Sequence, residues 1–231
     1  MIRQTKEGVW IIDGDTCIGK FIEESKRLDH DQYLLPKVCQ YIKEGDTVID
    51  CGALYGDHSL AYANKVGTYG TVLAFEVNPE AYECLYRNMR DVPQVKIYQV
   101  GLGEKNELLT IRQSQNAGAS FIDHDETISL PTIRVNALDD MNLSRLDFFK
   151  LDVEGYELKA LKGARQTLIR LRPKVLMEIN KAALERNGAS FKAIADFMQA
   201  LGYSIEDVYP EVEDMDNEPQ YDILFAYYSD M

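Results

Sequence analysis

The chain has 231 residues, of which 45% are hydrophobic and 27% are charged, a balance typical of a folded globular protein and not of a disordered one. Its length fits one domain with an additional arm better than two domains. The net charge is −13 and Lys and Arg do not cluster, which argues against a nucleic-acid partner. No apolar run reaches the roughly 18 residues of a membrane span, and the chain begins without an apolar signal segment, so we expect no membrane association.

Four cysteines are scattered along the chain without a CxxC pair, at Cys17, Cys39, Cys51 and Cys84. Reduced thiols are the simpler interpretation of this spacing in a chain of this length. We therefore expect a cytoplasmic protein.

Residues 1–44 are expected to form a hairpin and helix arm. The segment "GVWIIDGDTCIGKFI" reads as two short strands around Asp13 and Gly14, a hairpin turn signal. Apolar residues then recur near helical spacing from Asp31 to Ile42. We expect this arm, with Tyr33, to cover a cofactor and acceptor pocket in a larger domain that spans residues 45–231.

Strand-like and helix-like segments alternate from residue 45 onward. Strands are expected at 47–50, 71–76, 95–100, 107–113, 132–138, 145–152, 174–179 and 221–228, and helices at 57–66, 79–89, 156–171 and 191–201. Asn78 and Ser190 are suitable N-caps for two of the helices, and Pro79 suits a first helical position. This alternation predicts an α/β fold with a mostly parallel sheet and helices on both faces.

Acidic residues follow four of the predicted strands, at Asp50, Glu76, Asp152 and Glu178. In open parallel sheets ligands bind at the carboxyl ends of the strands. We therefore expect these four carboxylates to surround one ligand site.

The segment "TVIDCGALYGDHSL" predicts a ligand turn directly after a buried strand. Gly52 and Gly56 allow close backbone approach, and a helix that begins near Asp57 offers free N–H groups. Glu76 is suited to the hydroxyls of a ribose. The turn lacks one glycine of the dinucleotide fingerprint and carries Asp50 before the first glycine, which favours S-adenosylmethionine over NAD. An NAD-dependent oxidoreductase with an eroded fingerprint remains the alternative.

Five ordered motifs extend this interpretation over residues 45–180: "DTVIDCGALYGDHSLAYA", "VLAFEVNPEAYECLYRNM", "QVGLGEKNELLTI", "FFKLDVEGYELKALKGA" and "PKVLMEIN". Together they resemble the successive motifs of FkbM-type methyltransferases. The resemblance implies a Rossmann-like class I fold with a seven-stranded sheet. It also implies S-adenosylmethionine as cofactor, S-adenosylhomocysteine as product, and O-methylation of a sugar, glycan or natural-product hydroxyl. Leu54 departs from the family, whose members usually have Asn there.

The resemblance also implies the residues of the site. The cofactor would be bound by Asp50, Gly52, Ala53, Tyr55, Gly56, Ser59, Glu76, Val77, Gly101, Leu102 and Asp152. Val100 would lie with Gly101 and Leu102 beside the adenine. A non-catalytic homologue that only binds the cofactor is a further alternative, against which the complete set of acids argues.

Methyl transfer to a hydroxyl needs a group that takes the proton, and the candidates are Glu154, Asp152 and His58. Asp152 and Glu154 flank Val153, so strand alternation would point both acids the same way. We assign Glu154 to the substrate side and Asp152 to the cofactor side. His58 has a suitable ordinary pKa for a base, but it could equally bind the cofactor or pack locally.

Two further features remain open. Asp152, Glu178 and Asn180 could hold Mg²⁺, although hydrogen bonding to the substrate is the favoured role of these oxygens. The polar loop at 114–129 has the length of a binding loop or lid, with Ser120 and His124 as its candidate contacts. The sequence carries no signal for an oligomeric state.

Overall fold

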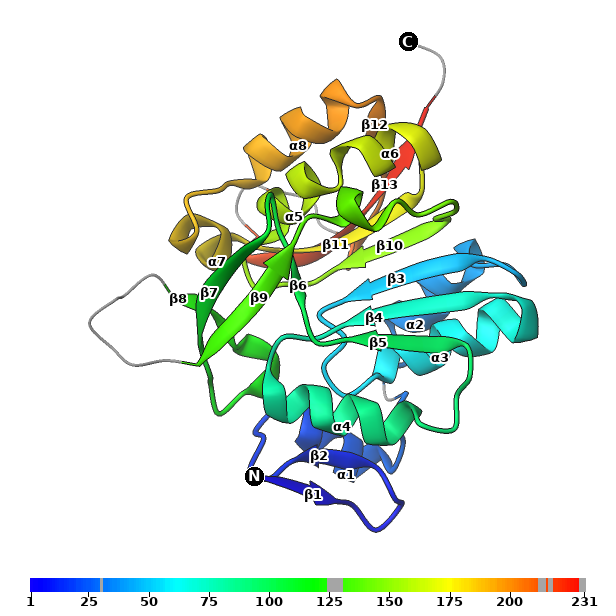
Figure 1. Cartoon of the computed structure of the whole chain (residues 1–231), viewed down its shortest axis with the longest axis vertical. Coiled ribbons are helices and arrows are strands. Elements are labelled where there is room, and N and C mark those ends of the chain that lie inside the picture. The colour runs from blue at the N-terminus through cyan, green and yellow to red at the C-terminus, as the bar shows by residue number, and fades with distance from the viewer. Residues whose placement is uncertain (30, 124–130, 212–214, 216–217, 229–231) are drawn as a thin grey trace.

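A computed structural model describes residues 1–29, 31–123, 131–211, 215 and 218–228 (Figure 1). Its centre is a seven-stranded sheet with the order β12-β13-β11-β10-β3-β4-β5. The strands are β3 (Thr47–Cys51), β4 (Thr71–Phe75), β5 (Val95–Tyr98), β10 (Phe148–Leu151), β11 (Lys174–Asn180), β12 (Tyr203–Tyr209) and β13 (Gln220–Tyr227). The expected α/β fold is confirmed.

The strand order reverses between β3 and β10, which lie side by side although about 100 residues separate them in sequence. The five strands β5, β4, β3, β10 and β11 are parallel, and β13 runs antiparallel to both β11 and β12. A reversal of this kind opens a crevice at the carboxyl ends of the two strands. The topology therefore predicts where a ligand binds before any side chain is considered.

Helices cover both faces of the sheet because neighbouring strand residues point to opposite sides. Val48 and Phe148 pack with α2 (Leu34–Val38), the 3-10 turn η1 (Cys39–Tyr41) and α3 (Asp57–Val66). Ile49 and Phe149 pack on the other face with α5 (Glu157–Gly163), α6 (Arg165–Leu171) and α8 (Phe191–Ala200). The remaining helices are α4 (Pro79–Met89) and α7 (Lys181–Arg186), and the other 3-10 turns are η2 (Gly67–Tyr69), η3 (Ala117–Ala119) and η4 (Leu138–Met141). None of the helices in the described part of the chain is long and apolar enough to cross a membrane.

A second sheet with the order β6-β9-β7-β8 is inserted between β5 and β10 (Figure 1). Its strands are β6 (Gly101–Leu102), β7 (Glu107–Arg112), β8 (Phe121–Asp123) and β9 (Thr132–Asn136). Ile111, Ile133 and Val135 form a small core with Tyr156 from the start of α5. This core attaches the insertion next to the carboxyl ends of the central strands.

The N-terminal hairpin is formed by β1 (Ile2–Gln4) and β2 (Trp10–Ile12), so the expected turn at Asp13 and Gly14 was wrong. Residues after that point form a helix, α1 (Ile18–Ser25). The reason is Asp15, whose carboxylate accepts hydrogen bonds from the N–H groups of Cys17 and Gly19 at 3.1 and 2.7 Å. These bonds start a helix where propensity alone suggested a strand.

The helix expected at 156–171 is divided in two at Ala164. The Asp139 carboxylate accepts hydrogen bonds from the N–H groups of Gln166 and Thr167 and so gives α6 its own start. Strand β12 and helix α7 were not predicted. The caps at Asn78 and Ser190 are confirmed, because each side chain accepts a hydrogen bond from the first turn of its helix.

Candidate active site

A cavity of about 740 Å³ lies at the carboxyl ends of β3, β4, β10 and β11. Gly52, Glu76 and Asp152 line it from the central sheet. The N-terminal arm contributes Cys17, Ile18, Phe21, Asp31, Gln32 and Tyr33, and the inserted sheet contributes Ile111, Phe121, Ile122, Ile133 and Val135. The cavity is therefore lined by three parts of the fold: the central sheet, the N-terminal arm and the inserted sheet.

The turn after β3 brings the backbone of two strand ends into contact. Gly52 has a φ of +83°, and a Cβ at this position would lie 1.8 Å from the Asp152 carbonyl oxygen. The N–H groups of Gly52 and Ala53 both donate to the Phe75 carbonyl at 3.0 Å. Only glycine fits this position, because it removes the Cβ and tolerates the positive φ.

Glu76 lies one residue beyond β4 and faces the cavity with its carboxylate anchored by backbone groups. Its oxygens accept hydrogen bonds from the N–H groups of Leu54 at 2.8 Å and Asn78 at 2.7 Å. Burial raises the pKa of Glu76, although these backbone bonds oppose the shift. Each oxygen keeps a lone pair, so the carboxylate can also accept from a bound ligand.

Leu54 occupies the left-handed region with a φ of +46°, where Asn is far more common than a branched apolar residue. The Leu54 N–H group nevertheless donates a hydrogen bond to Glu76, so Leu in place of the family's usual Asn leaves the backbone arrangement of the turn unchanged.

An apolar wall continues from Glu76 along the strand ends. It is formed by Val77, Val100, Gly101, Leu102, Ile111, Ile133 and Val135. The expected cofactor residues Val77, Gly101 and Leu102 therefore line the cavity together.

Five of the expected cofactor residues lie behind the cavity wall: Asp50, Ala53, Tyr55, Gly56 and Ser59. The Asp50 side chain is fully buried and accepts a hydrogen bond of 2.6 Å from the Ser59 hydroxyl. The Tyr55 hydroxyl donates to Asp15 of the arm at 2.8 Å. These contacts support the turn from behind, and direct contact of these five residues with a cofactor stays a prediction.

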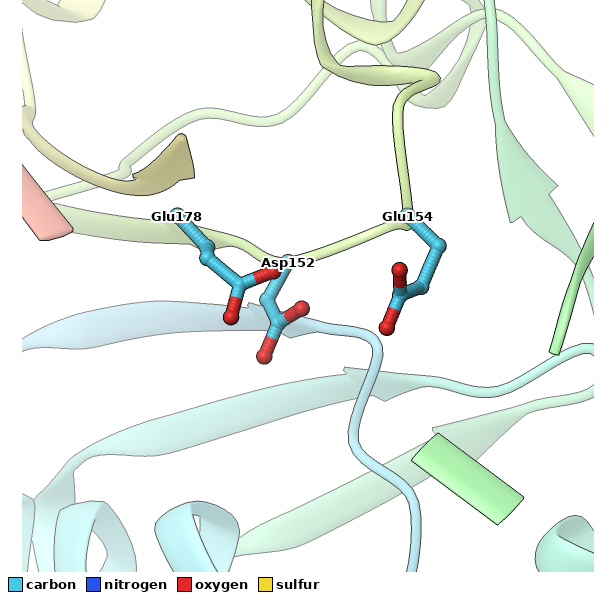
Figure 2. A group of neighbouring side chains, drawn as sticks. All are labelled: Asp152, Glu154 and Glu178. Atoms are coloured by element: carbon cyan, nitrogen blue, oxygen red, sulfur yellow. The ribbon is translucent and has the colours of Figure 1, made fainter. Parts of the chain in front are cut away.

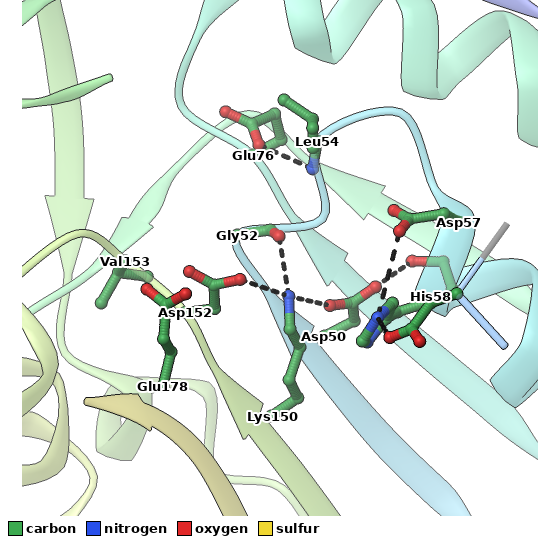
Figure 3. Close-up of polar contacts among 12 residues, drawn as sticks. Asp50, Gly52, Leu54, Asp57, His58, Glu76, Lys150, Asp152, Val153 and Glu178 are labelled. Carbon is green, nitrogen blue, oxygen red and sulfur yellow. Dashed lines mark hydrogen bonds and ion pairs between the residues drawn. The ribbon is translucent and has the colours of Figure 1, made fainter. Parts of the chain in front are cut away.

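Lys150 is a site residue that the sequence did not lead us to predict. Its ammonium lies 3.4 Å from an Asp50 oxygen and 3.3 Å from an Asp152 oxygen, and it donates to the Gly52 carbonyl at 3.1 Å (Figure 3). The signal was available, because Lys150 interrupts the apolar strand "FFKL" and lies beside Asp50 in the parallel register.

Asp152, Glu154 and Glu178 direct their carboxylates toward a common space (Figure 2). Their oxygens lie within 4.8 Å of one another. Burial and the charge of Asp152 raise the pKa of Glu154 to about 7. The charge of Asp152, together with burial, raises the pKa of Glu178 to about 9, and Gln220 donates to this side chain at 2.7 Å. The structure thus brings together the two acids around Val153 and adds Glu178 to them.

The turn that carries Glu154 is strained. Glu154 has a φ of +52°, and Gly155 follows at +98°. The Glu157 carboxylate accepts hydrogen bonds from the N–H groups of Val153 and Gly155, both at 3.1 Å, and so closes the turn. A left-handed glutamate costs on the order of 1 to 3 kcal/mol, and such residues concentrate at functional sites.

His58 lines the cavity but has neighbours at both ring nitrogens. Nδ1 lies 3.2 Å from the Tyr62 hydroxyl, and Nε2 lies 3.5 Å from an Asp31 oxygen and 4.0 Å from an Asp57 oxygen. Burial opposes protonation of the imidazole, but Asp31 and Asp57 outweigh it and raise the pKa of His58. The imidazole therefore links α3 to the arm.

The remaining candidates have more local roles. The Asn180 side chain accepts a hydrogen bond from the N–H group of Ala183 and caps α7. The third oxygen ligand beside Asp152 and Glu178 is therefore offered by Glu154 and not by Asn180. Ser120 lines the cavity and donates to the Ala117 carbonyl at 3.0 Å. His124 lies outside the described residues. The four cysteines are free thiols.

Comparison with known proteins agrees with this geometry. Residues 50–205 match the methyltransferase FkbM domain. Over 142 residues the chain is 26% identical to the hexuronic acid methyltransferase AglP of Haloferax volcanii, a match that covers 60% of this chain and 58% of that protein.

Two solved structures share the fold. The methyltransferase FkbM of Methylobacillus flagellatus KT superposes with a TM-score of 0.59 at 16% identity, over 89% of this chain and 52% of that one. A SAM-dependent methyltransferase of Aquifex aeolicus superposes with a TM-score of 0.50 at 16% identity, over 91% and 97%. The chain thus spans little more than half of the curated relative and of the FkbM structure. The family match favours methyl transfer over the oxidoreductase alternative, and the chain belongs to the methyltransferase FkbM domain family.

Proposed function

We propose that the protein is an S-adenosylmethionine-dependent O-methyltransferase that acts on a hydroxyl of a sugar, glycan or natural product. The observation that carries the proposal is the position of Glu154, a carboxylate with a raised pKa beside Asp152 in a cavity at the strand ends. A hydroxyl is a poor nucleophile at neutral pH, and a base with a pKa near the operating pH is the most effective way to activate it.

The cavity residues around Gly52, Glu76 and Leu102, which we call the cofactor half, fit S-adenosylmethionine. Gly52 lines the cavity at the end of β3, Glu76 would accept hydrogen bonds from the ribose hydroxyls, and the apolar wall around Leu102 would pack on the adenine. When bound, this cofactor supplies an electrophilic methyl group.

Glu154 acts as the base in this proposal and Asp152 as its ionised neighbour. The charge of Asp152 is one cause of the raised pKa of Glu154 and helps it to take a proton near pH 7. His58 is less suited, because both of its ring nitrogens already have neighbours. The arm and the inserted sheet line the cavity and would shield the acceptor's reacting hydroxyl from water.

A neutral polyhydroxylated acceptor suits the charges of the cavity. Lys150 and His58 are the two basic side chains among its described lining residues, and both already face carboxylates. Phe21 and Tyr33 are half exposed on the arm and offer apolar surface to a ring. The name of the Haloferax volcanii relative supports a sugar acceptor as the class to test first.

We favour catalysis without Mg²⁺. Lys150 already provides a positive charge to Asp152, and the Asn180 oxygen that would complete a metal site caps α7. Activity should therefore persist in EDTA. A loss that added Mg²⁺ restores would assign a cation to Asp152, Glu154 and Glu178 instead.

The test is methyl transfer from tritium-labelled S-adenosylmethionine to methyl glycosides of hexoses, hexosamines and hexuronic acids, with mass detection of one added CH₂ group. We expect turnover of a neutral glycoside to rise with pH through about 7, the pKa of Glu154. Glu154→Gln should lower kcat by roughly 100-fold or more and remove this pH dependence. Glu185 is an exposed acid on α7, and Glu185→Gln is the matched control, which should change neither kcat nor its pH dependence.

Two results would contradict the proposal. Full turnover by Glu154→Gln would remove Glu154 from the base role. Stabilisation of the protein by NADH, with no binding of S-adenosylhomocysteine in calorimetry, would reject the cofactor.

A further inference from the structure

Lys150 is a buried lysine in the middle of the central sheet. Its neighbours Phe149 and Leu151 pack into the core with α5 and α6, while Lys150 points to the α3 side of the sheet together with Phe148. It is 7% exposed, and the part that remains exposed faces the cavity. A lysine at such a position is strongly unfavourable unless its charge is compensated.

Two carboxylates provide this compensation. Burial opposes the charged form of Lys150, but Asp152 and Asp50 outweigh it and raise its pKa well above the ordinary value. The Asp50 oxygen at 3.4 Å has no hydrogen-bond partner, so the Lys150 charge is what balances it. The lysine therefore remains an ammonium ion throughout the pH range of ordinary assays.

The contacts of Lys150 connect the two halves of the cavity (Figure 3). On the cofactor side it donates to the Gly52 carbonyl and pairs with Asp50, which also receives the Ser59 hydroxyl from α3. It also pairs at 3.3 Å with Asp152, the neighbour of the acceptor-side acid Glu154. One side chain thus contacts both the Gly52 turn and Asp152, the acid beside the proposed base. The backbone of the turn also lies directly against Asp152, because a Cβ on Gly52 would lie 1.8 Å from the Asp152 carbonyl oxygen.

We propose that Lys150 is a positioning residue, which fixes the Gly52 turn and the Asp152 carboxylate relative to each other so that cofactor and acceptor meet in line. This inference rests on the proposed methyl transfer. In-line displacement depends strongly on alignment, and a misplacement of about 1 Å can reduce the rate roughly 100-fold. The hydrogen bond to the Gly52 carbonyl and the pair with Asp152 connect the turn to this acid through one side chain.

The experiment compares Lys150→Met, Lys150→Arg and the control Lys174→Met. Lys174 begins β11 at the opposite end of the sheet and also pairs with an acid, Glu206, so its loss removes a more exposed ion pair remote from the cavity. The measurements are the thermal midpoint, the calorimetric affinity for S-adenosylhomocysteine, and kcat and KM for the cofactor.

We expect Lys150→Met to weaken S-adenosylhomocysteine binding about 10-fold and to lower kcat about 100-fold. Lys150→Arg keeps the charge in a different shape and should recover part of both losses. Lys174→Met should change the thermal midpoint alone. Equal affinity and kcat in Lys150→Met and the wild type would overturn the proposal, as would an effect limited to the thermal midpoint.

A second variant guards against simple unfolding. Lys150→Met leaves Asp50 buried without its cation, and Asp50→Asn with Lys150→Met removes that uncompensated charge. The double variant should fold and still show weak binding and slow turnover. Wild-type protein that binds S-adenosylhomocysteine but methylates none of the glycosides would count against the proposed acceptor, while the binding data would still test Lys150.

Discussion

The two halves of the cavity are built in different ways. Most of the cofactor half comes from residues 52–102, in which the turn after β3, Glu76 and the strand ends at 100–102 follow one another, and the inserted sheet completes its apolar wall. The acceptor half combines Glu154 and Glu178 with Gln220 and the arm, and Asp152 lies where the two halves meet. Cofactor recognition is therefore more local in sequence than acceptor recognition, which depends on long-range packing.

The halves also differ in how they hold their acids. Glu76 is anchored by two backbone N–H groups, so its geometry is set by the turn itself. Glu154 and Glu178 have raised pKa values because they are crowded with Asp152 in a partly buried space. The first arrangement suits binding, and the second suits proton transfer at the expense of stability.

The largest effect is expected where the Gly52 turn contacts the Asp152 backbone, and Gly52→Ala should break this contact. The new Cβ would lie 1.8 Å from the Asp152 carbonyl in addition to a left-handed backbone. We expect a loss of about 3 kcal/mol or more in the free energy of unfolding and no measurable cofactor binding. Gly14→Ala is the control, because Gly14 has a φ of +79° with no atom within 4 Å. It should cost about 1 kcal/mol. Similar costs for the two variants would show that the clash is relieved by movement.

The acceptor half should make stability depend on pH. Glu178 binds its proton more tightly in the folded protein, since its pKa rises from 4.5 to about 9. Its stabilising contribution is therefore fully present below pH 4.5 and is lost as the pH rises toward 9. Glu178→Gln should raise the thermal midpoint at pH 8.5 by a few degrees and change it little at pH 4. An equal shift at both values would contradict the charge explanation.

The smallest effect is expected in the cofactor half, at Leu54. Asn tolerates the left-handed φ of +46° better than Leu, so Leu54→Asn should relieve backbone strain. Leu54 also packs against a hydrophobic cluster, which limits the net gain to about 0.5 kcal/mol by thermal unfolding. Cofactor affinity should stay within a factor of about 3 if the N–H bond to Glu76 is what matters. A larger gain in affinity would indicate a direct side-chain contact.

The sequence predicted elements best where local signals were complete. Asn78 and Pro79 located the start of α4, and alternating segments located most of the central strands. It failed at α1 and at the break between α5 and α6, where Asp15 and Asp139 accept hydrogen bonds that begin helices. The carboxylate of Asp139 comes from a distant segment, and no propensity scale records such a bond.

Among the site residues, the glycine turn, Glu76 and the acids around Val153 followed from the sequence alone. Their positions after strands suffice, because parallel strands bring their carboxyl ends to one edge of the sheet. Only the tertiary structure decided that Asp50 lies behind the wall and that Lys150 lies between the two halves. The physical reason is register: β3 and β10 meet after about 100 residues of intervening chain, and only their pairing puts the lysine charge beside Asp50 and Asp152.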